Sequence, residues 1–176
     1  MTRTKLLIIA LVALTAACTK SSSPSGPSTP AAPRTYTFTA TLLPSNEVPP
    51  ITNAEANGNG TATITLTVTR DNNNTITAAT TVFSVALSGF PGGMTLTAAH
   101  IHEGGPTCAC PVKIQTTLAS GEVALAANGT GSFTKTNIAT PADVATAMIA
   151  NPANYYFNVH TALNGGGVAR GILILN

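Results

Sequence analysis

The chain contains three histidines, and all three stand in two short segments with strand-like patterns. His100 and His102 flank a single isoleucine, and His160 lies in the segment 155–161. Because the side chains of an extended strand alternate between its two faces, His100 and His102 project from the same face. Three neutral imidazoles from two strands are a ligand set for Cu(II) or Zn(II), with a water or an outside ligand at the open position. We therefore predict His100, His102 and His160 as candidate metal ligands.

The same histidines also have a structural interpretation. Imidazoles can join strands through hydrogen bonds to backbone carbonyls and to Thr or Asn side chains, and such a network needs no metal. Alternation places Asn158 on the same face of its strand as His160, but it does not establish that this face meets His100 and His102. The sequence leaves the metal site and the structural network as alternatives.

Four polar residues are candidates to support such a site. Ligand histidines usually donate their second ring N–H to an acceptor, and Glu47, Glu103 and Asn158 are the candidate acceptors. Glu47 is also expected to cap backbone N–H groups in a turn after the first strand. Arg170 could bind an anion through its guanidinium, but an ion pair with Glu47 is favoured. No nucleophile paired with a base is recognisable, so no catalytic residue is predicted and an enzyme is disfavoured.

Threonine-rich segments with a two-residue period predict the strands that position these side chains. Segments 35–42 and 61–69 alternate polar and apolar residues, which is typical of strands with one buried face. Asn128-Gly129 predicts a hairpin between 122–126 and 131–136. Further strands are expected over 75–87, through His100 and His102, and over 155–161 and 168–175.

One short helix is predicted among the strands. Thr140 is the expected N-cap, Pro141 the first helical residue and Val144–Ala150 the body. Short strands without crossover helices predict an all-β fold, an antiparallel Greek-key β-sandwich or barrel of about eight strands with this one helix. Tyr155 and Tyr156 begin a strand, so one is expected in the core and the other at the surface.

The N-terminal residues resemble a bacterial lipoprotein signal. Arg3 and Lys5 precede an apolar run that is too short to span a bilayer, and the segment 14–18 resembles a lipobox. The resemblance implies a signal peptide over 1–17, lipidation of Cys18 and a membrane anchor, and Thr19 implies sorting to the outer membrane. Residues 18–33, rich in Ser and Pro, are predicted to be a flexible tether, followed by a single domain over 34–176.

The charge balance disfavours nucleic acid as a partner. The chain carries eight Lys and Arg residues against six Asp and Glu residues. Removal of residues 1–17 takes away two basic residues, which leaves the two signs equal in number. No basic stripe remains, whereas binding to nucleic acid depends on one.

Two cysteines, Cys108 and Cys110, remain once Cys18 is lipidated. An even pair in an oxidising compartment favours a disulfide. A pair separated by one residue closes only in a tight turn and tends to be easily reduced, so two free thiols are an alternative. Two thiolates on a metal ion are the less favoured interpretation.

Several separated motifs resemble, in the right order, the CHRD domain, which is named after chordin and is frequent in bacterial exported proteins. They are 37–42, Asn46–Pro50, Ala99–His102, Tyr155–Thr161 and Arg170-Gly171, and the resemblance covers essentially Tyr36–Leu175. Val168 stands where the family tends to have an acidic residue, and Cys108-Ala109-Cys110 lies in a loop that the family usually fills with small residues. The chordin copies belong to an extracellular protein that binds growth factors, and no general catalytic role is established for the domain.

Together these observations predict an exported, lipid-anchored protein of the cell envelope that acts as a non-catalytic binding module. Its expected partner is an envelope or extracellular protein, or a metal ion held by the three histidines. One alternative is a copper or zinc metalloprotein or metalloenzyme with a three-histidine site. A second alternative is a purely structural envelope protein.

Overall fold

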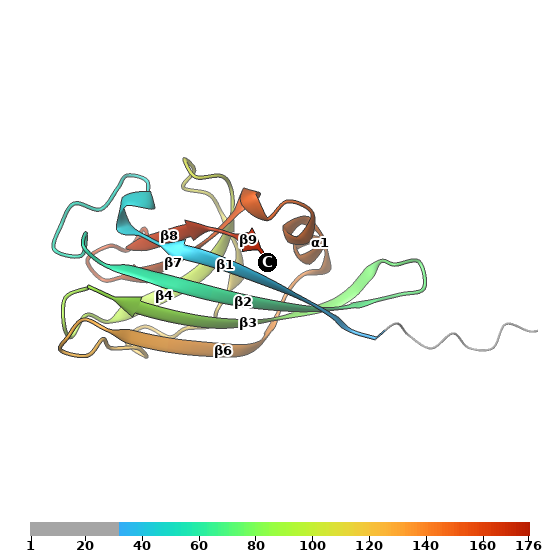
Figure 1. Ribbon diagram of the computed structural model, residues 1–176, viewed down its shortest axis with the longest axis horizontal. Helices are drawn as coiled ribbons and strands as arrows, with labels where there is room; N and C mark the ends of the chain where they lie inside the picture. Colours follow the sequence, from blue (N-terminus) through green and yellow to red (C-terminus); the bar gives the residue numbers. More distant parts are fainter. Residues whose placement is uncertain (1–31) are drawn as a thin grey trace, which may run out of the picture.

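The computed structural model describes residues 32–176, and two antiparallel sheets form a sandwich (Figure 1). The predicted signal peptide and Cys18 lie outside the described residues. The larger sheet has the order β6-β3-β2-β1-β9 and the smaller sheet the order β5-β4-β7-β8. The strands are β1 (Arg34–Leu42), β2 (Asn59–Arg70), β3 (Ile76–Ser88), β4 (Leu96–Glu103), β5 (Val112–Gln115), β6 (Gly131–Ala139), β7 (Tyr155–Thr161), β8 (Ala169–Ile172) and β9 (Ile174–Leu175). The predicted all-β sandwich is confirmed.

Helical structure is confined to one α-helix, α1 (Ala142–Ala150), and two short 3₁₀ turns, Pro44–Asn46 and Pro152–Asn154, in the part of the chain that is described. The chain passes from the larger to the smaller sheet between β3 and β4, returns between β5 and β6, and crosses again through α1 into β7. None of the described helices is long and apolar enough to cross a membrane.

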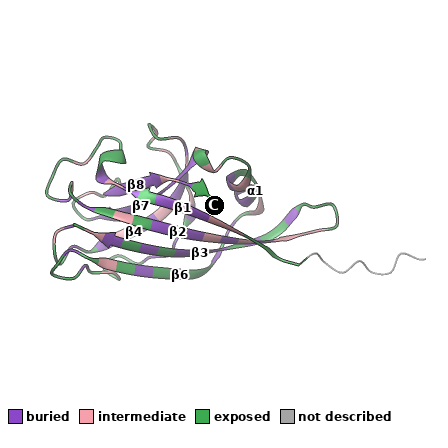
Figure 2. Cartoon of the chain, viewed as in Figure 1, coloured by how far each residue is buried: buried purple, intermediate pink, exposed green. Residues whose placement is uncertain are grey.

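The facing sides of the two sheets form one hydrophobic core. Buried and more exposed residues alternate along β2 and β3, as Figure 2 shows. Phe83 of β3 and Phe157 of β7 are fully buried and stack across the sandwich, with 5.7 Å between their ring centroids. Aromatic burial of this kind is a major source of folding free energy. It also fixes which residues of β7 face inward, and hence that Asn158 and His160 face outward.

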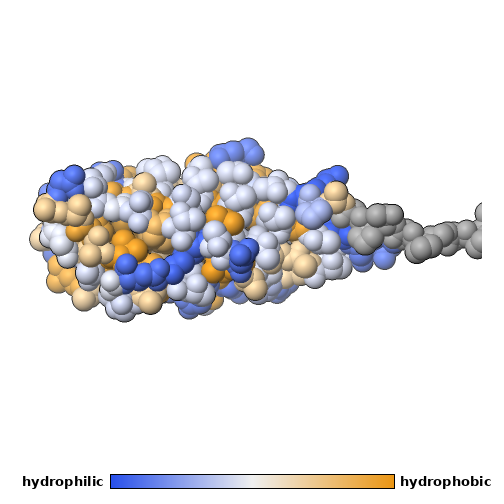
Figure 3. Space-filling view, turned by 90° about the horizontal axis from the view of Figure 1, so that it is seen from below, coloured by the Kyte–Doolittle hydropathy of each residue, from blue (hydrophilic) through white to orange (hydrophobic). Residues whose placement is uncertain are grey.

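The outer faces of the two sheets differ. In the larger sheet, register pairs Thr37 with Thr65 and Thr39 with Thr63, which gives an uncharged, hydroxyl-rich face. Seen from below in Figure 3, the surface mixes hydrophilic and hydrophobic residues, with an apolar area toward the end away from the grey segment. In contrast, β7 is buried along its whole length. Its outer face is therefore covered by other parts of the chain.

The helix starts differently from the prediction. Pro141, not Thr140, is the N-cap of α1, and it makes no side-chain capping bond. The Thr140 hydroxyl instead lies in the interior, 2.6 Å from the hydroxyl of buried Thr81. A buried hydroxyl without a partner is costly, so the tertiary contact overrides the local capping preference.

The predicted hairpin at Asn128-Gly129 is only half right. The turn forms, with Gly129 at φ 74°, and β6 follows it. Residues 122–126 are not a strand, since Ala124 makes only an isolated bridge with Thr95. Their backbone bonds instead with the start of β4 and the residues before it, for example from the Leu96 N–H to the Val123 carbonyl at 2.9 Å and from the Leu125 N–H to the Met94 carbonyl at 2.8 Å. Strand β6 pairs with β3 and not with this segment.

Replacement of Thr81 by valine is expected to lower the free energy of unfolding by about 1–2 kcal/mol, because it removes the short bond to the buried Thr140 hydroxyl. The double variant Thr81→Val/Thr140→Val is expected to be closer to wild type, because neither hydroxyl is then left unpaired. Urea unfolding of the two single variants and the double variant measures this coupling. If the losses of unfolding free energy in the two single variants simply added up in the double variant, the hydrogen bond between Thr81 and Thr140 would be contradicted.

Candidate metal centre

The three histidines meet on the outer face of the smaller sheet. Core residues Ala99 and Ile101 alternate with His100 and His102 along β4. Strand β7 pairs with β4 so that Asn158 lies opposite His100 and His160 opposite Ala98. Antiparallel pairing therefore brings the outward faces of the two strands together, which alternation alone could not establish.

The nitrogens of the three rings are close together. One ligand atom from each histidine lies within 4.8 Å of the others. His100 Nδ1 and His160 Nε2 are 3.1 Å apart. Two nitrogens bound to one zinc ion at about 2.0–2.1 Å and at a tetrahedral angle are roughly 3.3 Å apart. The separation between His100 and His160 therefore suits either a hydrogen bond or a shared metal ion.

Backbone carbonyls fix the protons on two of the rings. His102 Nδ1 lies 2.6 Å from the Cys110 carbonyl oxygen, and His160 Nδ1 lies 3.0 Å from that of Gly165. A carbonyl oxygen only accepts, so each of these Nδ1 atoms carries a hydrogen, and Nε2 of each neutral ring keeps a lone pair. This is the arrangement that orients histidine ligands in metal sites.

The two Nε2 atoms face the cluster with few donors available. His160 Nε2 is near His100 Nδ1 and is also 3.0 Å from Asn158 Oδ1. His102 Nε2 is buried and has no hydrogen-bond partner among the described residues. Two imidazole lone pairs and the Asn158 amide thus lie close together beside the N–H of His100, and the Asn158 side chain also influences His102.

The three histidines do not readily become protonated, so protonation does not supply a positive charge beside their lone pairs. Burial, aided by the neighbouring His160 and His102, lowers the pKa of His100 to about 4. Burial also lowers the pKa of His102 and of His160, against the opposing effect of their bonds to carbonyls and, at His102, of the nearby Asn158 side chain. All three rings are accordingly neutral near pH 7, which is the form that binds a metal ion.

A row of side chains across the smaller sheet links the cluster to a buried ion pair. Register places Gln115, His100, Asn158 and Arg170 next to one another on successive strands. Arg170 is 3 % exposed and its Nε lies 3.9 Å from Glu47 Oε2. The ion pair favoured by the sequence is present, although the distance is at the limit of direct contact.

Most of the bonds of Arg170 go to backbone carbonyls. Its guanidinium donates to the carbonyls of Asn46 at 2.5 Å, Cys108 at 2.7 Å and Pro106. It also lies over the ring of Tyr156, 4.6 Å from the centroid. Arg170 therefore ties two loops to the outer face of the sheet and is not free to bind an outside anion.

Glu47 and Glu103 differ from their predicted roles. Glu103 forms a partly exposed ion pair with Lys113 at 2.7 Å and is not one of the clustered ligands. Glu47 is buried, and its Oε1 has no hydrogen-bond partner within residues 32–176, so the carboxylate does not cap the turn as expected. Burial raises the pKa of Glu47 to about 7, although Arg170 opposes this shift.

Tyr156 is the site residue that the sequence interpretation missed. Both Tyr155 and Tyr156 are buried, so the expectation that one lies at the surface is wrong. Tyr155 joins the core, whereas the Tyr156 ring stacks on His102 with 4.7 Å between centroids and 5° between planes. Tyr156 lies two residues before Asn158, and this spacing is the signal that could have placed it on the histidine face.

A comparison with known families identifies the domain. The sequence model of the CHRD domain matches residues 38–173. The chain belongs to the CHRD domain family. No curated protein and no solved structure matches the chain. Val168, at the position where an acidic residue was expected, is fully buried in the core of this CHRD domain and contributes no charge to the site.

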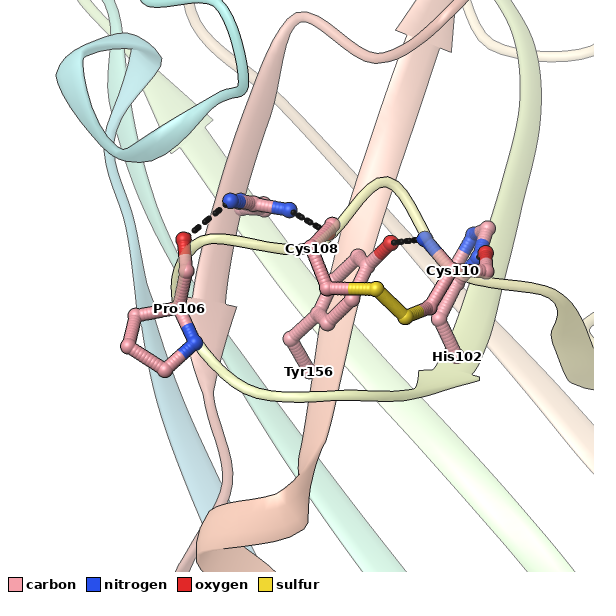
Figure 4. Close-up of a disulfide and its surroundings, with 6 residues drawn as sticks. His102, Pro106, Cys108, Cys110 and Tyr156 are labelled. Atoms are coloured by element: carbon pink, nitrogen blue, oxygen red, sulfur yellow. Dashed lines mark hydrogen bonds between the residues drawn. A yellow bond between two sulfur atoms is a disulfide. The ribbon is translucent and has the colours of Figure 1, made fainter.

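The cysteine pair of this CHRD domain lies beside the histidines. Cys108 and Cys110 form a disulfide with 5.2 Å between their Cα atoms. Figure 4 shows the disulfide next to Tyr156, with His102 beside Cys110. The Cys110 N–H donates to the Tyr156 hydroxyl at 3.1 Å. Backbone groups of the cysteine segment thus contact both members of the His102–Tyr156 stack.

Replacement of Glu47 by glutamine is expected to change how stability depends on pH. Between pH 4.5 and about 7 the unfolded chain releases the Glu47 proton while the folded protein retains it, so this group makes unfolding easier as pH rises. Relative to wild type, Glu47→Gln should gain about 1–3 kcal/mol between pH 5 and pH 8. Urea unfolding of metal-free wild type and metal-free Glu47→Gln at several pH values measures the difference in their free energies of unfolding. A difference that does not change with pH would contradict a raised pKa of the buried Glu47 carboxyl.

Proposed function

We propose that this CHRD domain is a non-catalytic binding module that holds one Zn(II) or Cu(II) ion through His100, His102 and His160. The observation that carries the proposal is that ligand atoms of the three imidazoles lie within 4.8 Å of one another, and that one of the rings, His102, has a buried Nε2 without a direct hydrogen bond in the described part of the chain. Buried polar atoms are rarely left unpaired unless a function or a bound species accounts for them.

The distribution of lone pairs supports a cation at this point. The Nε2 atoms of His102 and His160 are acceptors, because their Nδ1 atoms donate to carbonyls. Asn158 Oδ1 is a further acceptor next to His160. A metal ion satisfies these lone pairs at once, and His100 joins the ligands by moving its proton from Nδ1 to Nε2. A small side-chain rotation closes the remaining separation, which is at most 4.8 Å.

The surroundings favour binding over catalysis. His, Cys and acidic groups that cluster at ligand distance are limited, in residues 32–176, to the three histidines. Glu47 and Arg170 engage each other and the loops, so neither is placed as a general base beside the cluster. The half-buried His100 marks the side on which a water or an outside ligand would complete the coordination.

The proposed location is the outer membrane of the bacterial cell envelope, on its periplasmic or its surface face, with the domain held by a lipid on Cys18. Support comes from the N-terminal charges, the apolar run and the lipobox-like segment 14–18. A mature protein whose N-terminal residue is a lipidated Cys18, found in the outer-membrane fraction, is the expected result. A soluble product released by cleavage at another residue would overturn the anchor.

Titration of tag-free protein with Zn(II) and Cu(II), in competition with a chromophoric chelator, tests the metal proposal. The expected result is one equivalent bound per chain, with an affinity that falls at acidic pH as the imidazoles become protonated. Substoichiometric binding that a chelator strips without any change in thermal stability would overturn it.

A structural network is the second candidate, and Asn158 is the observation that favours it. If the amide were reversed, its NH₂ group would donate to His160 Nε2 and satisfy that lone pair without a metal. This candidate predicts a metal-free protein whose melting temperature is unaffected by Zn(II) or by chelator. The titration therefore distinguishes the two functions.

A further inference from the structure

The segment 104–111, here called the disulfide loop, connects β4 to β5 and lies against the histidine cluster. Its backbone contacts His102 at two points, directly and through Tyr156. The Cys110 carbonyl accepts the His102 Nδ1–H at 2.6 Å, and the Cys110 N–H donates to the Tyr156 hydroxyl at 3.1 Å. Cys110 thus holds both the edge of the imidazole and the ring that stacks on its face.

The other half of the loop is fixed by Arg170. The guanidinium donates to the carbonyls of Pro106 and Cys108 and lies over the same Tyr156 ring. The result is a stack of His102, Tyr156 and Arg170, with the loop backbone bonded to all three. A change in the path of the loop is therefore transmitted to His102.

The disulfide has a local effect rather than a global one. The entropy that a cross-link removes from the unfolded chain grows with the length of the closed loop, and here only Ala109 lies between the two cysteines. Its main effect is to fix the backbone between Cys108 and Cys110, and so the direction of the Cys110 carbonyl. Both cysteines are only half-buried, so a reductant can reach them.

We propose that the Cys108–Cys110 disulfide is a redox switch for the metal centre, in which the oxidised loop orients His102 for tight binding and reduction weakens binding. This inference rests on the proposed metal site. The natural reductant is a dithiol. One of its thiolates attacks a cysteine sulfur and breaks the S–S bond, and its second thiol then resolves the mixed disulfide. Two electrons and two protons pass to the cysteine thiols, and the dithiol leaves as a disulfide.

The first test compares the Zn(II) affinity of the oxidised protein with that of protein reduced by a phosphine. Because loss of a bond to a ligand histidine typically costs 10–100-fold in metal affinity, reduction is expected to weaken Zn(II) binding by about that factor. Equal affinity in the two states, or tighter binding after reduction, would overturn the switch and leave the metal site standing. Failure of both states to bind Zn(II) would overturn the metal site itself.

The double variant Cys108→Ser/Cys110→Ser is the matched control, because it opens the loop without providing thiolate ligands. It is expected to bind Zn(II) as weakly as the reduced wild type and not to respond to reductant. An affinity equal to that of the oxidised wild type would overturn the proposal. Circular dichroism and thermal unfolding show whether the double variant retains the fold. If the double variant does not fold, the comparison of oxidised with reduced wild type still tests the proposal.

Linkage gives a reciprocal measurement. If oxidation strengthens Zn(II) binding by a given factor, bound Zn(II) must make the disulfide harder to reduce by the same factor. The reduction equilibrium is measured in a glutathione redox buffer, with free Zn(II) set by a chelator, and thiols are counted by alkylation and mass spectrometry. The same equilibrium constant with and without Zn(II) would overturn the coupling.

Discussion

Replacement of His102 by alanine is expected to abolish stoichiometric metal binding, with a loss of affinity greater than about 100-fold. The loss of a bond that merely orients a ligand costs 10–100-fold, and removal of the ligand itself should cost more. His102 is the informative position because its Nε2 has no other partner in the described structure. If His102 is not a metal ligand, replacing it by alanine should leave the metal affinity unchanged, and that result would contradict the proposal.

Two control variants separate lost coordination from lost structure. His102→Phe retains an aromatic ring to stack on Tyr156 but has no ligand nitrogen, so it should lose the metal as completely as His102→Ala. Ser132→Ala removes an exposed side chain of β6, in the larger sheet and away from the histidines, and it should bind Zn(II) as wild type does. Chelator-competition titration measures all three. Metal binding retained by His102→Phe would contradict the proposed ligand set.

The sequence could predict half of this site. A two-residue period places His100 and His102 on one face because alternation is a local property of a strand. Convergence with His160 depends on the register between β4 and β7, strands far apart in the chain. That register is set by burial of residues such as Phe157 against the opposite sheet, which no local pattern records.

Backbone partners explain what the sequence could not provide. The acceptors for the Nδ1–H groups of His102 and His160 are the carbonyls of Cys110 and Gly165, whereas the side chains of Glu47, Glu103 and Asn158 were the predicted candidates. Every residue carries a carbonyl, so residue type gives no signal for this role. The same limit applies to Thr140, whose local preference for capping gave way to a buried partner distant in the chain.

Replacement of Arg170 by methionine is expected to lower the free energy of unfolding by about 3–5 kcal/mol, the range seen when one partner of a buried ion pair is removed. The change leaves the carbonyls of Asn46, Pro106 and Cys108 without their donor and removes the cation over Tyr156. It also leaves the carboxyl of Glu47 without its countercharge. A loss of this size is a large part of the stability of an ordinary domain.

Two further variants assign the loss to geometry or to charge. Arg170→Lys retains the positive charge but cannot present a planar fork to three carbonyls, so it should recover only a minor part of the loss. Glu47→Gln added to Arg170→Met should recover part of it above about pH 7, where the unfolded chain ionises Glu47 but the folded protein, without Arg170, must keep it protonated. Urea unfolding with a check that the slope is unchanged measures each step.

Arg170→Met is expected to affect metal binding as well as stability, because Arg170 fixes the disulfide loop that orients His102. If the loop acts on the metal centre as argued, this variant should also bind Zn(II) more weakly at a temperature where it is fully folded. Glu47→Gln alone leaves the guanidinium bonds to the loop in place and should bind Zn(II) as wild type does. Folded Arg170→Met lacks both guanidinium bonds to the disulfide loop. If it nevertheless bound Zn(II) with wild-type affinity, the orientation of His102 would not depend on the loop.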